Sequence, residues 1–131
     1  MRTGLGIIAL TAAYAMPGHA QELDCRDPQT QVEMTGCAAR DYEAADAELN
    51  AAWGEAMAWA RRMDEGLPAD QVPAADILRD AQRAWIPFRD QACEAESLAA
   101  RGGTMQNMLF YMCLTRLTEV RTEDLRNLGL E

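Results

Sequence analysis

Apolar residues recur at helical spacing in three long stretches of the chain, and no stretch alternates in the manner of a β-strand. The first predicted helix covers residues 28–63, with Asp27 as its N-cap. The second covers residues 74–100, and the third covers residues 105–127 after an N-cap at Thr104. This order of elements predicts an all-α fold, an antiparallel three-helix bundle.

The same spacing predicts which faces turn inward. The expected core positions are Met34, Ala38, Tyr42, Ala45, Leu49, Ala52, Ala56 and Met63 on the first helix; Leu78, Ala81, Trp85, Phe88, Ala92 and Ala95 on the second; and Met105, Leu109, Met112, Leu117 and Val120 on the third. Pro87 lies inside the second helix, removes one backbone donor and predicts a kink. Residues 64–73 hold one Gly and two Pro and are predicted to form a loop.

The N-terminal stretch is typical of a secretory signal peptide. Its apolar run, residues 4–15, is about 12 residues long, short of the roughly 20 that a membrane-spanning helix needs. Arg2 precedes the run, and small residues stand at the expected cleavage position after Ala20. A cut after Ala15 is a less favoured alternative. We therefore expect a signal peptide over residues 1–20, and a mature domain over residues 21–131 that is periplasmic or secreted without stable membrane insertion.

Composition excludes several classes of function. The 12 basic residues face 21 acidic ones, and a net charge of -9 disfavours binding to a nucleic acid. The single histidine, His19, falls in the predicted signal peptide, so the mature domain has none with which to build a Ser-His-Asp or Cys-His site or a histidine-containing zinc site. We predict no catalytic residues, no metal and no cofactor.

Four cysteines remain in the predicted mature domain, an even number that in a small exported protein predicts two disulfides. Cys93 and Cys113 lie equally far from Gly103, so they come level in an antiparallel hairpin that turns there. This register favours Cys93–Cys113 and leaves Cys25–Cys37, while crossed pairings stay open. A site of four thiolates is disfavoured because no two cysteines are closely spaced.

The hairpin register has a second consequence. It places Asp90 opposite Arg116 and Trp85 near Arg121. We therefore predict an ion pair between Asp90 and Arg116, or one between close helical neighbours of these two residues.

Three blocks of residues carry a family resemblance. They are Cys25 with Glu33-Met34-Thr35-Gly36-Cys37-Ala38, Tyr42 and Asp46; then residues 81–93, which include Gln82, Trp85, Phe88, Arg89 and Asp90; then Gly102-Gly103-Thr104, Cys113, Thr118, Arg121 and Leu125. Together they resemble the LprI-like lysozyme-inhibitor N-terminal domain family (DUF1311) over about residues 25–125. The resemblance implies an exported, disulfide-containing helical domain whose namesake binds and inhibits lysozyme. It implies no catalytic residues.

The second block has two interpretations. Trp85, Phe88 and Arg89 could form a binding hot spot, because Trp and Arg dominate such sites. We favour a structural role instead, with Trp85 and Phe88 in the core and Arg89 held by Asp46 or Asp90.

Two other clusters have functional alternatives. Met105, Met108 and Met112 could bind a soft metal such as Cu(I), but methionines at helical spacing more often fill a core. The acids Glu33, Asp41, Asp46, Glu94 and Glu96 could supply a general acid and base, but scattered helical acids usually form solvated faces.

The favoured function is inhibition of a lysozyme-type peptidoglycan-cleaving enzyme. A cationic lysozyme is the expected partner, because a net charge of -9 would steer it toward this surface. We place the contact on acidic side chains that flank exposed helix ends or on the acidic residues of the 64–73 loop, Asp64, Glu65 and Asp70. The alternative is a structural or stress-related cell-envelope domain with another protein partner and no catalysis.

Overall fold

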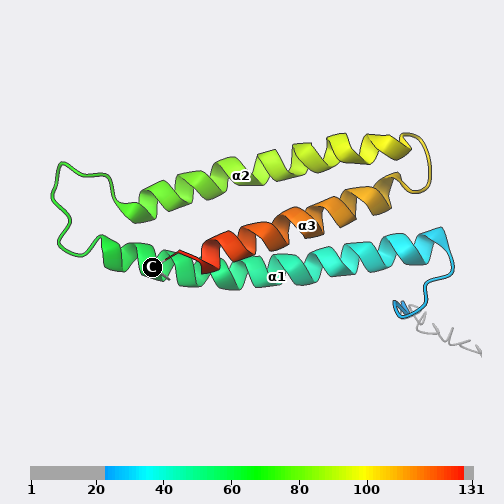
Figure 1. Cartoon of the computed structure of the whole chain (residues 1–131), viewed down its shortest axis with the longest axis horizontal. Coiled ribbons are helices and arrows are strands. Elements are labelled where there is room, and N and C mark those ends of the chain that lie inside the picture. Colours follow the sequence, from blue (N-terminus) through cyan, green and yellow to red (C-terminus); the bar gives the residue numbers. More distant parts are fainter. Residues whose placement is uncertain (1–22, 129–131) are drawn as a thin grey trace, which may run out of the picture.

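The computed structural model describes residues 23–128, so the predicted signal peptide lies outside them. Three α-helices make up most of this part: α1 (Gln31–Met63), α2 (Ala74–Ser97) and α3 (Gln106–Arg126), with a short 3-10 turn at Leu98–Ala100 after α2. They run up, down and up again in an elongated bundle (Figure 1). The all-α, antiparallel three-helix prediction is confirmed. No helix within residues 23–128 has the length and apolar character to cross a membrane.

The start of α1 differs from the prediction. The helix begins at Gln31, and its N-cap is Thr30 rather than Asp27. The Thr30 hydroxyl accepts from the Glu33 backbone N–H at 3.2 Å, and a Glu33 carboxylate oxygen accepts from the Thr30 N–H at 2.9 Å. This reciprocal capping box satisfies two of the free donors of the first turn, which explains why the helix begins here.

The loop over residues 64–73 is confirmed, and one of its acids closes it. Asp64 is the C-cap of α1, and its carboxylate accepts from the backbone N–H groups of Ala74 at 2.6 Å and Ala75 at 3.1 Å. A single side chain thereby caps the start of α2, whose own N-cap position is Pro73 without a side-chain hydrogen bond. The loop projects from one end of the bundle (Figure 1).

The start of α3 also differs from the prediction. Its N-cap is Met105, without a side-chain hydrogen bond, rather than Thr104. The preceding turn is instead closed by Gln106, whose side-chain oxygen accepts from the Gly102 N–H at 3.0 Å. Gly102 has a φ of 75°, a conformation that glycine adopts without the strain of a Cβ.

Two clusters form the core, one toward each end of the bundle. We call the first the tryptophan end: Leu49, Ala52, Ala56, Met57, Ala60, Ala75, Leu78 and Leu125 are buried, with Trp53, Trp59 and Trp85 packed against them. We call the second the disulfide end, which carries both disulfides: Cys93, Cys113 and Leu114 are buried, with Tyr42, Phe110, Tyr111 and Leu117 packed against them. On α1 the predicted stripe is largely correct, although Met63 is exposed.

The predicted inner faces of α2 and α3 are partly wrong. On α2, Phe88, Ala81 and Ala95 are exposed. At the N-cap of α3 Met105 is exposed, as are Met112 and Val120 on the helix itself. The buried positions are instead Ala75, Leu78, Arg89, Cys93 and Ser97 on α2, and Cys113, Leu114, Thr118, Thr122 and Leu125 on α3. The buried face of α2 is thus rotated by about a quarter turn, because the bridge to α3 requires Cys93 to face inward.

Both favoured disulfides are confirmed. Cys93 joins Cys113 with Cα atoms 5.3 Å apart, and Cys25 joins Cys37 with Cα atoms 5.6 Å apart. The predicted Asp90–Arg116 ion pair is wrong. Arg116 pairs with Glu96 at 2.6 Å and Asp90 pairs with Arg89 at 2.8 Å, so the ion pair from Arg116 to α2 forms six positions beyond Asp90.

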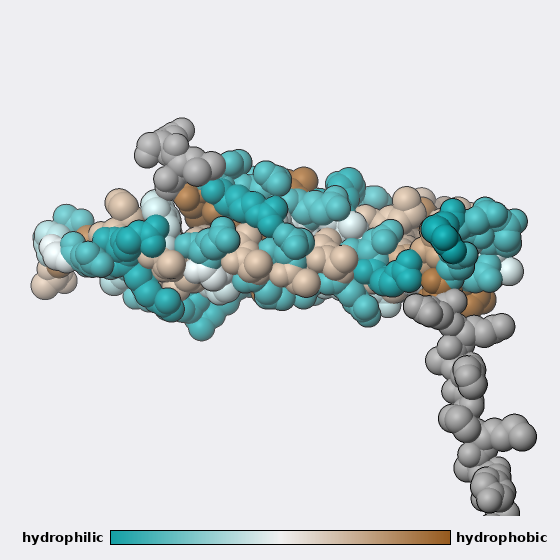
Figure 2. All heavy atoms as spheres, turned by 90° about the horizontal axis from the view of Figure 1, so that it is seen from below, coloured by the Kyte–Doolittle hydropathy of each residue, from teal (hydrophilic) through white to brown (hydrophobic). Residues whose placement is uncertain are grey.

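The outward face of α1 is largely polar. Seen from that side, hydrophilic residues extend along the whole bundle, with small apolar residues between them (Figure 2). The exposed positions of α1 include Arg40, Asp41, Glu43, Glu48 and Glu55.

Candidate functional site

A buried arginine lies between the two core clusters. The Arg89 side chain is 8% exposed, yet its guanidinium makes three polar contacts. Its Nε donates to an Asp90 carboxylate oxygen at 2.8 Å, and its Nη1 donates to the Thr118 hydroxyl at 3.4 Å. Asp46 on α1 lies 3.7 Å from the same Nη1. Arg89 therefore links all three helices, as a buried cation must be matched by acceptors.

Two aromatic rings flank the same guanidinium. The Arg89 Cζ lies 5.1 Å from the Trp85 ring centroid and 5.4 Å from the Tyr42 centroid, within cation–π range. Burial raises the pKa of the Tyr42 phenol, and the positive charge of Arg89 opposes that shift. The phenol therefore stays neutral throughout the physiological range.

A groove of about 310 Å³ runs between α1 and α2 beside this arginine. It is lined by Asp46, Leu49, Asn50 and Trp53 from α1, and by Arg79, Gln82, Arg83, Ile86 and Arg89 from α2. Several of its polar groups are already engaged: Arg79 pairs with Asp76, and the Gln82 side-chain oxygen accepts from Arg121 at 3.0 Å. The charged side chains of this groove are paired within the chain. Their chemistry therefore supports the packing of the helices and the positioning of neighbouring side chains.

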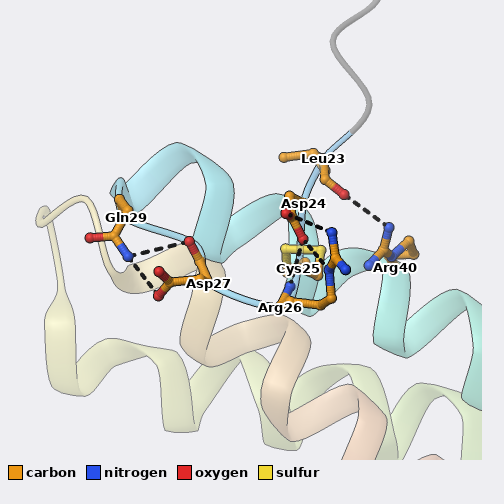
Figure 3. Close-up of polar contacts among 8 residues, drawn as sticks. Leu23, Asp24, Cys25, Arg26, Asp27, Gln29 and Arg40 are labelled. Carbon is orange, nitrogen blue, oxygen red and sulfur yellow. Dashed lines mark hydrogen bonds and ion pairs between the residues drawn. A yellow bond between two sulfur atoms is a disulfide. The ribbon is translucent and has the colours of Figure 1, made fainter.

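A wider hollow, of about 580 Å³, lies where the lead-in meets α1. Figure 3 shows Arg26 folded onto Asp24, and the Arg40 guanidinium donating to the Leu23 carbonyl oxygen at 3.2 Å. The hydrogen bond from the Arg26 side chain lowers the pKa of Asp24, and the Arg26 backbone N–H adds to the effect. With the Cys25–Cys37 bridge, these contacts fasten the lead-in to α1.

The predicted partner-binding acids do not behave alike. Asp64 is half-buried and engaged as the cap of α2, whereas Glu65 and Asp70 are exposed on the loop. Val72, which is 66% exposed, lies on the same loop. The loop thus presents two exposed carboxylates and the large apolar side chain of Val72, while Asp64 fixes its closure.

The structure separates the residues of the predicted second block. Trp85, Arg89 and Asp90 come together around the guanidinium, and Gln82 holds Arg121. The expected holders of Arg89, Asp46 and Asp90, both contact it, so the pairing of Arg89 with a carboxylate is confirmed. Phe88 is 61% exposed, so its predicted place in the core is wrong.

Two members of the arginine site were missed. Tyr42 was assigned to the core and Thr118 received no role, although both belong to the blocks that carry the family resemblance. Thr118 is fully buried and interrupts the apolar residues of α3, a polar position that could have been recognised as needing a partner.

The methionines and the predicted acids take other positions in the structure. Met105 and Met112 are exposed, so the favoured prediction that they fill the core is wrong, and the Met108 Sδ accepts from the Gln31 amide at 3.5 Å. Among the predicted acids, Glu33 caps α1, Asp46 faces Arg89 and Glu96 pairs with Arg116. No group of three or more His, Cys, Asp or Glu within residues 23–128 is arranged to hold a metal ion.

Comparisons with known proteins indicate the family to which this chain is similar. The family model described as "Lysozyme inhibitor LprI" matches residues 25–125. An uncharacterised protein of Rhizobium meliloti (strain 1021) is 40% identical over 98% of this chain and 96% of its own length. The uncharacterised protein YecT of Escherichia coli (strain K12) is 28% identical over 76% of this chain and 65% of its own length.

A solved structure supports the fold. The crystal structure of a DUF1311 family protein from Pseudomonas putida KT2440 aligns with a TM-score of 0.64 and 25% sequence identity. The alignment covers 80% of this chain and 99% of that one. The expected resemblance to the LprI-like family is confirmed.

Proposed function

Because the chain belongs to the LprI lysozyme-inhibitor family, we propose that it is an exported binding protein that occludes a lysozyme-type peptidoglycan-cleaving enzyme. It acts by binding and has no catalytic residues of its own. The two disulfides support an extracytoplasmic location, because such bonds persist in oxidising compartments. Cleavage after Ala20, in the segment outside the described residues, belongs to the same proposal.

The acidic loop is the observation that carries the binding mode. Glu65 and Asp70 are exposed on the 64–73 loop. This loop projects from one end of the bundle (Figure 1), and a protruding segment can enter a concave active site. Asp64 is committed to the α2 cap, so the partner-contacting acids are Glu65 and Asp70, while Asp64 holds the loop in shape. With the net charge of -9, these carboxylates favour a cationic partner.

Binding of the purified, oxidised protein to a basic lysozyme tests this proposal. We expect a complex whose association rate falls as salt rises and the Debye length shrinks toward about 8 Å. The double variant Glu65→Gln/Asp70→Asn should associate several-fold more slowly, because it loses steering charge at the contact. Asp64 is left unchanged in this variant to keep the α2 cap.

A matched variant separates local contact from net charge. Glu43→Gln/Glu55→Gln removes the same two charges from the exposed face of α1. An equal slowing in both variants would exclude the loop as the contact while keeping inhibition. Absence of a complex with any lysozyme type, even at low salt, would contradict inhibition itself and favour a structural envelope domain with another protein partner.

A further inference from the structure

One face of α2 is apolar but lies in solvent. Ile77, Ala81, Ala84 and Phe88 are all exposed, with Ile77 at 59% and Phe88 at 61%. We call these four residues the α2 stripe. Large apolar side chains that are exposed together on one helix face mark an interaction surface.

The α2 stripe has the spacing of a helix-pairing seam. Its members are separated by four, three and four positions, which keeps them on one side of the helix in the manner of a coiled-coil seam. The order is also symmetric, with a large residue at each end and two alanines between them. Two copies of α2 laid antiparallel place Ile77 level with Phe88 of the second copy, and Ala81 level with its Ala84. Small residues at the centre permit the two helices to approach closely.

A groove beside the stripe provides room for the large side chain. Ile77 and Ala81 border an apolar groove of about 430 Å³, whose other lining residues include Trp59, Leu78 and Leu128. In the antiparallel arrangement, Phe88 of the second copy comes level with Ile77 and meets this groove. The same contact is made twice by symmetry, as in an isologous interface.

The charges next to the stripe are complementary in the same register. Asp80 and Arg83 lie along one flank of it, and each is more than 70% exposed, with an ion-pair distance of 3.6 Å between them. An exposed pair of this kind contributes little to a single chain, so both groups are available to a partner. The antiparallel register leaves Asp80 two positions from the level of Arg83 of the second copy, within reach of the long arginine side chain, and the reverse contact follows by symmetry. Two such crossed pairs would fix the orientation of the helices.

We propose that α2 is a self-association surface, through which two copies of this chain pair antiparallel along the α2 stripe. The occupant of the exposed face is a second copy because both the apolar order and the charges are self-complementary. The contact involves one helix from each copy, which places it at the small end of specific interfaces. The dimer is therefore weak and concentration-dependent. This inference does not depend on lysozyme binding.

Sedimentation of the purified, oxidised protein over a wide concentration range tests the proposal. The average mass should rise from the monomer value toward twice that value as concentration increases. Phe88→Glu should remain monomeric, because it puts a charge at both ends of the seam. Val32→Glu is the control, since Val32 is 81% exposed but lies on α1, and it should associate as the unmodified protein does. Circular dichroism checks that each variant keeps its helices.

Charge exchange tests the register itself. Asp80→Arg and Arg83→Asp should each weaken the dimer by at least several-fold, because each puts like charges together across the seam. The double variant Asp80→Arg/Arg83→Asp should recover it. A protein that is monomeric at every concentration, or single variants that associate normally, would overturn the proposal. If Phe88→Glu abolishes lysozyme binding while the unmodified protein is monomeric, the face belongs to the target enzyme and the proposal is also wrong.

Discussion

The two ends of the bundle are held together by different means. At the tryptophan end, all three helices contribute to an apolar cluster, and Asp64 closes the loop by capping α2. At the disulfide end, the buried cluster is smaller, and its aromatic residues are only partly buried. Both disulfides lie at this end. Covalent bonds are thus found where apolar burial is least.

Arg89 lies between these two regions and belongs to neither cluster. It satisfies its charge with Asp46 and Asp90 and contacts Thr118 on α3. Removing one member of such a buried set leaves the others without partners, which ties the alignment of the helices to polar contacts as well as packing. The bundle therefore depends on three kinds of interaction along its length, and each can be removed separately.

The largest expected effect is the loss of the Cys93–Cys113 bond. Both cysteines are essentially inaccessible, and the bond joins α2 to α3 at the disulfide end. Replacing both by Ser should lower the free energy of unfolding by about 3–5 kcal/mol, from lost loop constraint and from burial of two hydroxyls. Urea unfolding of the variant and the unmodified protein measures this difference.

The region that loses stability when the Cys93–Cys113 bond is removed is as informative as the total loss. Hydrogen exchange should show lost amide protection first around Cys113, while α1 near Ala56 stays protected. The matched variant Cys25→Ser/Cys37→Ser should cost less, because the bond that it removes closes a shorter loop and attaches only the lead-in. Uniform loss of protection would show that the two ends unfold as one unit.

Leu125→Ala is the counterpart at the tryptophan end. Leu125 is 1% exposed and belongs to the cluster that no disulfide supports. Its truncation should cost about 2–4 kcal/mol through lost burial and a residual cavity. Thermal and urea unfolding of the oxidised protein measure this cost. A cost under about 1 kcal/mol would contradict the view that packing holds this end.

The sequence predicted the number, type and direction of the helices, because helical periodicity and turn residues are local signals. It also predicted both disulfides, since symmetry about Gly103 placed Cys93 level with Cys113. The rotation of α2 and α3 was not predicted. Phe88 continues the apolar periodicity of α2 but points to solvent, and no local signal distinguishes a stripe that meets the core from one that faces outward.

The candidate site was predictable only in part. The pairing of Arg89 with Asp46 or Asp90 followed from the rule that a charge near the core needs a partner. The contacts of Tyr42 and Thr118 with Arg89 depend on how three helices converge, which sequence spacing alone does not determine. Asp64 was assigned to partner binding, but its role in capping α2 requires the two ends of the loop to meet.

Two glycines inside α1 allow a further comparison of the tryptophan end with the disulfide end. A Cβ on Gly54, at the tryptophan end, would meet no atom within 4 Å, so Gly54→Ala should stabilise the protein by about 0.5–1 kcal/mol. A Cβ on Gly36, at the disulfide end, would lie 2.7 Å from a Leu23 methyl group. Gly36→Ala should gain less, because Leu23 must move aside. Unfolding curves of the two variants give the difference, and an equal gain would show that Leu23 is not held against α1.

The smallest effect is expected from the capping box at the disulfide end. Hydrogen bonds from the backbone N–H groups of Thr30 and Gln29 lower the pKa of Glu33. A carboxyl whose pKa is lower when folded stabilises the protein above the pKa of the unfolded chain, and this contribution disappears as pH falls through the folded pKa. Stability of the unmodified protein should therefore decrease in the acid range below about pH 4.5, and Glu33→Gln should flatten part of that decrease.

Glu43→Gln, on the exposed face of α1, is the control and should leave the acid slope nearly unchanged. Urea unfolding at a series of pH values measures all three, and identical slopes for Glu33→Gln and the unmodified protein would contradict a stabilising cap. The effect is small because the carboxylate is exposed and water competes for its hydrogen bonds.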